Sequence, residues 1–170
     1  RMSLMKFIVA RPINLVPRKE KSVSIVIAAR NEKGHIEKIV QSLPTIGKKT
    51  EIIFIEGGSK DDTWGEIKRV AAKYKSLGIK YAQQDGKGKG DAVRKGFDMA
   101  TGDILMIYDA DMTVPAKDLE KFYEAITSNK GEYINGTRLV YPMEKEAMRT
   151  LNLFGNKMFS LMFSWLLDQR

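Results

Sequence analysis

Residues 104–114 constrain the fold of this chain more than any other stretch, and they read ILMIYDADMTV. Five apolar or aromatic residues lead directly to Asp109 and Asp111, which a single alanine separates. A short apolar run of this kind is typical of a buried strand. The pattern therefore predicts a strand whose end carries two neighbouring carboxylates.

Two carboxylates this close repel each other unless a cation neutralises them. A hard divalent ion such as Mg²⁺ or Mn²⁺ prefers oxygen ligands, and Mg²⁺ is commonly held by one or two protein carboxylates together with phosphate oxygens of a substrate. Asp109 and Asp111 are thus candidate ligands of Mg²⁺ or Mn²⁺ in the company of a phosphorylated molecule. The alternative is a solvated turn in which Asp111 caps a helix that begins near Pro115.

Composition narrows the class of protein. The 170 residues are 43% hydrophobic and 29% charged, which is typical of one globular domain with a real core. The absence of cysteine excludes disulfides and thiolate metal sites. No apolar run approaches the roughly 18 residues that a membrane span needs.

The net charge of +8 is concentrated at the start of the chain, where residues 1–22 hold six cationic side chains and one acidic one. We therefore expect residues 1–21 to be a basic lead-in or linker and residues 22–170 to be the folded domain. No interleaved basic and aromatic patch indicates nucleic-acid binding, so we expect no nucleic-acid partner. The chain stops inside an apolar helical pattern, and we expect it to be an excerpt of a longer protein.

Short runs rich in β-branched residues alternate with amphipathic segments along the chain. We expect strands at 23–29, 51–56 and 79–83, in the run that leads to Asp109, and at 133–137. Helices are expected at 36–43, 64–74, 92–100 and 115–128. This alternation predicts an α/β fold with an open, mostly parallel sheet and helices on both faces.

Polar side chains follow each of these strands. In an open α/β sheet, ligands bind at the carboxyl ends of the strands, so these side chains are candidates for one shared site. The alternative is that loops are polar for solvation alone. The candidates, in chain order, are Arg30, Asn31, Glu32, Glu56, Asp85, Lys87, Lys89, Asp109, Asp111 and Arg138.

Residues 85–91 read DGKGKGD and suit a phosphate, because glycines let backbone N–H groups approach an anion and Lys87 or Lys89 adds a positive charge. The spacing matches neither the Walker pattern nor the dinucleotide pattern, and a flexible surface loop is the alternative. His35, the sole histidine, stands at a helix start, where we expect a solvated or capping role. No Ser/His/Asp or Cys/His constellation can be assembled.

Five blocks in order resemble those of family-two glycosyltransferases with the GT-A fold, which is Rossmann-like. The blocks are SIVIAARNE, IIFIEGGSKDDT, KGKGDAVRKG, TGDILMIYDAD and NGTR, and the likeness covers about residues 22–157. The branch most similar is the polyprenyl-phosphate one, typified by dolichol-phosphate mannose synthase. The resemblance implies an inverting transfer from a nucleotide-diphosphate sugar, of the GDP-mannose or UDP-glucose type, to a dolichyl or undecaprenyl phosphate.

The resemblance also implies roles for individual residues. Asp109 and Asp111 would hold the metal and the diphosphate, with Ala110 between them at the donor, and Arg138 would contact the acceptor phosphate or the departing diphosphate. Seven further residues would lie along the nucleoside or near the donor, and they are Ala29, Arg30, Asn31, Glu32, Glu56, Asp85 and Lys89. The residues at 22–170 would be the N-terminal portion of a catalytic domain, cytoplasmic and at the membrane surface.

This sequence departs from the family's pattern at several positions. Ala28 stands where proline is usual, and Gly57 where many members have a second aspartate, which leaves the base and ribose contacts open. After Arg138, residues 141–149 read YPMEKEAMR in place of the glycine-rich stretch of mannose synthases, which leaves the sugar and the acceptor open.

Three alternatives follow. A sugar hydroxyl acceptor would need a carboxylate base that this piece does not evidently supply. The DxDxT pattern also fits a haloacid-dehalogenase-like phosphatase, with Asp109 as nucleophile and Asp111 as general acid. The third is a binding module without catalysis. Residues 156–167, NKMFSLMFSWLL, predict either an interfacial helix that contacts the membrane or a buried helix.

Overall fold

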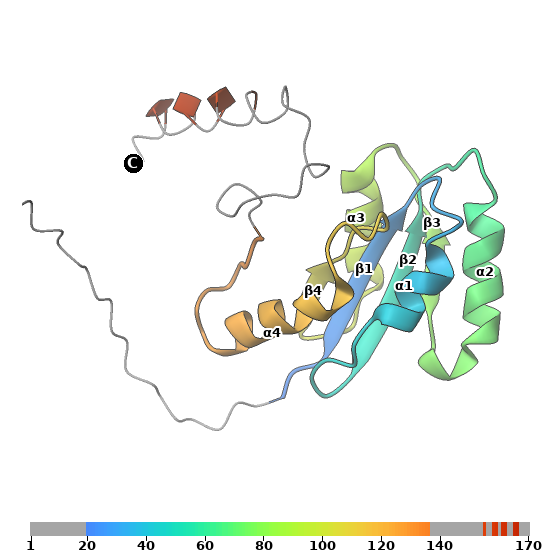
Figure 1. Cartoon of the computed structure of the whole chain (residues 1–170), viewed down its shortest axis with the longest axis horizontal. Helices are drawn as coiled ribbons and strands as arrows, with labels where there is room; N and C mark the ends of the chain where they lie inside the picture. Colours follow the sequence, from blue (N-terminus) through green and yellow to red (C-terminus); the bar gives the residue numbers. More distant parts are fainter. Residues whose placement is uncertain (1–19, 137–154, 156–157, 160, 163–164, 167–170) are drawn as a thin grey trace, which may run out of the picture.

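A computed structural model describes residues 20–136 and, near the end of the chain, residues 155, 158, 159, 161, 162, 165 and 166. Its helices and strands alternate, as the sequence predicts (Figure 1). In chain order they are β1 (Val23–Ala29), α1 (Ile36–Ser42), β2 (Thr50–Glu56), α2 (Thr63–Lys73), the 3₁₀ helix η1 (Lys75–Leu77), β3 (Lys80–Gln83), α3 (Lys89–Met99), β4 (Ile104–Ile107), the 3₁₀ helix η2 (Ala116–Asp118) and α4 (Leu119–Thr127).

The four strands form one parallel sheet in the order β3-β2-β1-β4. β1 lies in the middle of the sheet, where Ile25 is opposite Ile52 of β2 and Met106 of β4. Its residues read VSIVIAA and are almost fully buried, as expected for a central strand covered on both faces. The predicted fold class, an open parallel α/β sheet, is confirmed.

Helices cover both faces of the sheet. Ile25, Ile27 and Phe54 pack in one core cluster with apolar side chains of α1, α2, η2 and α4, whereas Val26, Ile53 and Ile55 pack in a second cluster with α3. Successive residues of a strand point to opposite faces, which is why neighbours in β1 belong to different clusters. Figure 1 shows α1 and α3 on opposite sides of the sheet.

The structure differs from the predicted elements in four places. β4 ends at Ile107, although the Tyr108 N–H still donates to the carbonyl of Val26 over 3.0 Å. A turn follows at Asp109, in which Met112 has a positive φ of 55° and its N–H donates to the Asp109 carbonyl over 3.3 Å. α3 begins at Lys89, three residues before the predicted start. Gly88 adopts a φ of 87° at the N-cap, a conformation that glycine adopts without strain.

The third difference is the fifth strand predicted at 133–137. Residues 133–136 are not in a strand. Tyr133 is 83% exposed, so its side chain does not have the burial expected of a strand residue. Thr137 lies outside the described residues. The predicted helix at 115–128 begins instead as the 3₁₀ turn η2 and becomes α-helical at Leu119.

Within the described part of the chain, no helix has the length and apolar character needed to cross a bilayer. The described residues of 156–167 are helical, and their apolar side chains are exposed, with Trp165 at 81% and Leu161 at 73%. Both the membrane contact of this stretch and the domain boundary at residue 21 stay predictions.

Candidate active site

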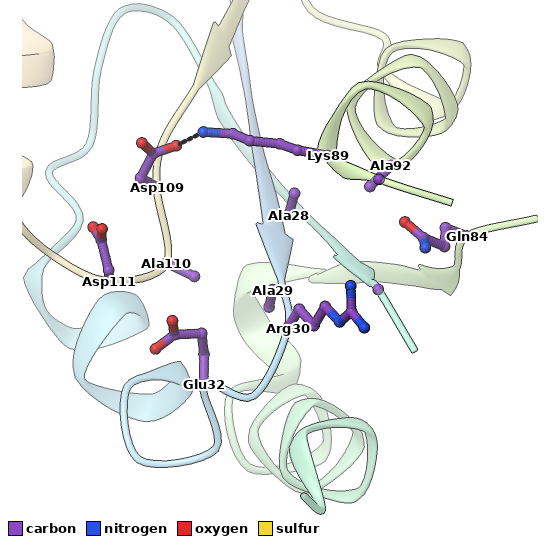
Figure 2. Close-up of a pocket in the computed structure, with 12 residues that line it drawn as sticks. Ala28, Ala29, Arg30, Glu32, Gln84, Lys89, Ala92, Asp109, Ala110 and Asp111 are labelled. Carbon is purple, nitrogen blue, oxygen red and sulfur yellow. Dashed lines mark hydrogen bonds and ion pairs between the residues drawn. The ribbon is translucent and has the colours of Figure 1, made fainter. Parts of the chain in front are cut away.

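A cavity of about 340 Å³ opens at the carboxyl ends of the strands, where the sequence predicts a shared site (Figure 2). Seven of the predicted site residues line it. These are Ala29, Arg30, Glu32, Lys89, Asp109, Ala110 and Asp111. The fold therefore brings side chains from the ends of β1 and β4 and from the start of α3 to a single concave surface.

The turn after β4 holds Asp109 and Asp111 at the cavity. Tyr108, just before it, is 3% exposed, and its hydroxyl donates to the carbonyl of Val114 over 2.8 Å, which ties together the two ends of the turn. Burial raises the pKa of Tyr108, and the negative charges of Asp111 and Asp109 raise it further. The two carboxylates thus sit at a fixed turn anchored by a neutral phenol.

Asp111 does not cap a helix. Its carboxylate accepts a hydrogen bond from the backbone N–H of Thr113 over 3.0 Å, and neither η2 nor α4 has a side-chain cap. The capping alternative for Asp111 is therefore wrong. Its second oxygen is left for a ligand of the cavity, since Asp111 lines that cavity together with Asp109.

Lys89 reaches across the cavity from the first residue of α3 and forms an ion pair with Asp109 (Figure 2). Both side chains are partly exposed, at 60% for Lys89 and 39% for Asp109. The start of α3 also presents backbone N–H groups and the positive end of the helix dipole. A lysine at this place adds a mobile positive charge beside two carboxylates.

The donor set suits a divalent cation that shares its coordination with a ligand. No cluster of three or more histidine, aspartate or glutamate side chains is placed to hold a metal among the described residues. Asp109 and Asp111 supply two carboxylates, which is the number that Mg²⁺ usually takes when phosphate oxygens and water complete its shell. Asp109 already forms an ion pair with the ammonium group of Lys89, which is consistent with a site that binds positive charge.

Small residues leave the space that makes the cavity. Ala28, Ala29, Ala92 and Ala110 line it with methyl groups, and Gly57 and Gly88 contribute only backbone. A Cβ atom on Gly57 would lie 3.3 Å from the Cβ of Arg30 and 3.6 Å from the amide oxygen of Gln84. Larger side chains at these positions would fill the cavity.

Glu32 lines the cavity from the loop after β1. Its backbone N–H donates to the hydroxyl of Thr63 over 2.9 Å, and its carboxylate accepts from Nδ1 of His35 over 2.6 Å. His35 stands at the N-cap position of α1 but makes no side-chain cap there. The His35 side chain is 41% exposed and contacts Glu32, so it does not cap the helix but is partly solvated.

Four of the described candidate residues do not line the cavity, namely Glu56, Asn31, Asp85 and Lys87, and the last of these is exposed. Glu56 is 2% exposed and accepts hydrogen bonds from the Ser59 backbone over 2.5 Å and from the Gln83 amide over 3.1 Å. Burial works to raise the pKa of Glu56, but the hydrogen bonds outweigh it and the pKa is lowered. Glu56 is therefore an anionic anchor of the turn between β2 and α2.

Asn31 and Asp85 likewise serve the loops around the cavity. Asn31 has a φ of 58°, and its side-chain oxygen accepts from the backbone N–H of Lys60 over 2.7 Å, so it links the β1 and β2 exits. Asp85 is exposed and pairs with Lys95 of α3 over 2.7 Å. Arg138, the last predicted residue, lies outside the described residues.

Five lining residues were not predicted as site residues. They are Ala28, Gly57, Gln84, Gly88 and Ala92. Ala28 and Gly57 carried a signal, since they are two of the positions at which the sequence departs from the family's pattern. Gln84 directly follows a strand, as the charged candidates do, but an uncharged amide did not stand out.

Comparison with known proteins gives the family. The model of the family described as "Glycosyl transferase family 2" matches residues 24–168, which are most of the chain. The chain belongs to glycosyltransferase family 2. This agrees with the resemblance read from the five sequence blocks, and the phosphatase alternative receives no support from it.

Two curated relatives are similar to this family member over part of their length. A dolichol-phosphate mannosyltransferase of Pyrococcus furiosus is 31% identical over 120 residues, which cover 69% of this chain and 33% of the relative. A dolichol-phosphate mannosyltransferase of Saccharomyces cerevisiae is 31% identical over 108 residues, which cover 61% and 40%. The chain thus spans about a third to two fifths of the length of these relatives.

A solved structure shares the fold. The mannosyltransferase PcManGT of Pyrobaculum calidifontis, in complex with GDP-Man and Mn²⁺, superimposes with a TM-score of 0.57 at 24% identity. The superposition covers 72% of this chain and 36% of that one. The parallel sheet and its helices therefore have the GT-A arrangement that the sequence blocks implied.

Proposed function

We propose that this chain is the donor-binding portion of a glycosyltransferase that moves a sugar from a nucleotide-diphosphate donor to a polyprenyl phosphate, with inversion and with the help of Mg²⁺ or Mn²⁺. One observation carries the proposal. Asp109, Asp111 and Lys89 lie together at one cavity at the carboxyl ends of a parallel sheet. Such a set of charges suits a diphosphate and a divalent cation, and little else of similar size.

The chemistry asks the protein to stabilise a leaving diphosphate. Negative charge builds on the diphosphate as the bond to the sugar breaks, and preorganised positive groups lower the barrier. A cation held by Asp109 and Asp111 would supply part of this charge as a Lewis acid. Lys89, whose ammonium group lies at Asp109, and the N-terminal N–H groups of α3 add further positive character at the cavity.

The acceptor is the second part of the proposal. A polyprenyl phosphate is already an anionic nucleophile, so no general base is needed to deprotonate it. The names of the two dolichol-phosphate mannosyltransferases support this class of acceptor. Arg138 is proposed to contact the acceptor phosphate or the departing diphosphate, and the exposed apolar side chains near Trp165 to contact the membrane surface that carries the acceptor.

Calorimetry tests the donor and the metal. We expect the chain to bind at least one of GDP-mannose, UDP-glucose and UDP-N-acetylglucosamine when Mn²⁺ or Mg²⁺ is present. Chelation of the metal should weaken binding by about tenfold or more, because the cation bridges protein and diphosphate. The Asp111→Ala variant should show the same loss in the presence of metal. Donor binding that is as tight in chelator, or in Asp111→Ala, would contradict the metal role.

A control variant separates the loss of a ligand from a general loss of charge. Asp118, the last residue of η2, is an aspartate of the same domain that pairs with Lys121 of α4 outside the cavity. Asp118→Ala should bind the donor as the unmodified chain does. The thermal unfolding midpoint of each variant shows whether the domain remains folded.

A further inference from the structure

The amide oxygen of Gln84 stands out among the described residues as the buried side-chain polar atom without a hydrogen-bond partner. A buried acceptor that is left unpaired costs free energy, and a native structure normally satisfies such atoms with protein, water or a ligand. Gln84 also lines the cavity of the candidate active site. Its oxygen can therefore accept a hydrogen bond from a ligand that binds in that cavity.

The orientation of this oxygen is fixed from both sides of the residue. The backbone N–H of Gln84 donates to the carbonyl of Glu56 over 2.9 Å, and its side-chain Nε2 donates to the carbonyl of Gly86 over 3.2 Å. A flipped amide would set its oxygen against the Gly86 carbonyl, so the hydrogen-bond network determines which amide atom faces the cavity. Figure 2 shows the oxygen pointing inward.

Gly57 lies beside this buried oxygen and leaves space next to it. A Cβ atom at that position would lie 3.6 Å from the Gln84 oxygen, within ordinary contact distance, and glycine leaves that space to a ligand. In Figure 2, Gln84 lies on the side of the cavity away from Asp109 and Asp111. A ligand that reaches both sides needs an anionic part at the carboxylates and Lys89, and an N–H donor at Gln84.

Resting on the proposed donor class, we infer that the Gln84 amide oxygen accepts a hydrogen bond from the ring N–H of the donor's nucleobase. Uracil and guanine carry such a ring N–H, at N3 and N1. Cytosine and adenine carry an unprotonated acceptor at the corresponding ring nitrogens, which would face the amide oxygen without a proton between them. Gln84 thereby selects uridine or guanosine diphosphate sugars over those of cytidine and adenosine.

Calorimetry with nucleoside diphosphates in the presence of Mn²⁺ tests this selection. For the unmodified chain, we expect GDP or UDP to bind about tenfold or more tightly than ADP and CDP, because the wrong base leaves a buried acceptor unpaired. Methylation of the ring nitrogen, in 1-methylguanosine or 3-methyluridine diphosphate, should cause a loss of the same size. Inorganic pyrophosphate has no base, so its affinity measures the contribution of the diphosphate contacts alone.

The Gln84→Met variant keeps the length of the side chain and removes the acceptor. It should bind GDP or UDP about tenfold more weakly, bind the methylated and unmethylated nucleotides equally, and keep its affinity for pyrophosphate. Gln41 of α1, whose amide donates to the Tyr74 hydroxyl over 2.9 Å outside the cavity, gives the matched control Gln41→Met. This control should discriminate among nucleotides as the unmodified chain does.

The possible failures are distinguishable. If the unmodified chain tolerates ring methylation, or if Gln84→Met discriminates as strongly as the unmodified chain, the oxygen is satisfied by water and the inference is overturned while the proposed function stands. If neither nucleotides nor pyrophosphate bind with Mn²⁺, the proposed function fails and the inference falls with it. Should Gln84→Met not fold, the methylation series on the unmodified chain still decides.

Discussion

Lys89 and Asp109 share an ion pair at the cavity, so a divalent cation at Asp109 has to compete with an ammonium group that is already there. Replacing Lys89 by methionine removes the competitor and keeps an unbranched side chain that is one atom shorter. We expect Lys89→Met to bind Mn²⁺ alone about two- to fivefold more tightly, the range that an exposed ion pair contributes. The paramagnetic resonance signal of free Mn²⁺ measures this affinity directly.

The same substitution should have the opposite effect on a diphosphate. With Mn²⁺ saturating, Lys89→Met is expected to bind GDP or UDP more weakly, because a positive group near the phosphates is lost. Lys121→Met, which breaks the ion pair between Lys121 of α4 and Asp118 of η2 outside the cavity, should change neither affinity. If Lys89→Met left Mn²⁺ binding unchanged, Lys89 would not compete for Asp109.

Charged site residues were easier to predict from the sequence than neutral ones. Asp109 and Asp111 stand out because two carboxylates after an apolar run need a cation. Glu56 follows a strand in the same way, yet it turns inward to accept hydrogen bonds from Ser59, and only the fold of the turn decides that. Ala28 and Gly57 act by leaving space, which a sequence alone does not locate.

α3 is the element that sets Lys89 in place, and its packing against the sheet can be tested with two glycines. A Cβ atom on Gly96 would lie 2.2 Å from Cγ1 of Val26 in β1, whereas one on Gly90 meets only the Arg94 side chain at 3.7 Å. Gly96→Ala should therefore destabilise the domain by about 1–3 kcal/mol through overpacking. Gly90→Ala should stabilise it by up to about 1 kcal/mol through helix propensity.

Urea unfolding measures the free energy of unfolding of each variant. Because the two expected changes have opposite signs, Gly90→Ala serves as the control for Gly96→Ala. Equal changes for Gly96→Ala and Gly90→Ala would show that α3 does not pack closely on β1.

At the scale of elements, the sequence predicted the buried strands well and the edges poorly. The apolar runs of β1 and β2 are long enough to determine their state, and the predicted bounds differ from the observed ones by at most one residue. The start of α3 was missed because it depends on the φ of 87° at Gly88. The strand predicted at 133–137 is absent at residues 133–136, because a short segment with one tyrosine and one isoleucine needs a partner strand, and the segment's own sequence does not specify one.

In the described domain, the candidate binding site and a cluster that stabilises the sheet lie near opposite ends of the strands. The cavity lies at the carboxyl ends of the strands, whereas a second polar cluster lies near their other ends, around the buried carboxylate of Glu51. Glu51 accepts from the Ser24 hydroxyl of β1 over 2.6 Å, pairs with Lys80 of β3 over 2.6 Å, and accepts from the backbone N–H of Thr101 over 3.0 Å. It joins three strands and the loop before β4.

This second cluster makes a prediction about pH. Burial works to raise the pKa of Glu51, but the hydrogen bonds from Lys80, Ser24 and Thr101 outweigh it and lower the pKa from 4.5 to about 2. A lowered pKa contributes stability that is present above about pH 4.5 and is lost as the pH falls through about 2, and a shift of this size corresponds to up to about 3 kcal/mol.

Glu51→Gln should therefore lower the free energy of unfolding at pH 7, and the gap to the unmodified chain should shrink as the pH falls from 4.5 to 2. Urea titrations at these pH values measure the gap, and Glu132→Gln, at an exposed position, should show none. Because Glu51 does not line the cavity, Glu51→Gln should keep its nucleotide affinity wherever it remains folded. A gap independent of pH would mean that the ionised form of Glu51 does not stabilise the sheet. A loss of affinity in the folded variant would mean that the two ends of the sheet are coupled.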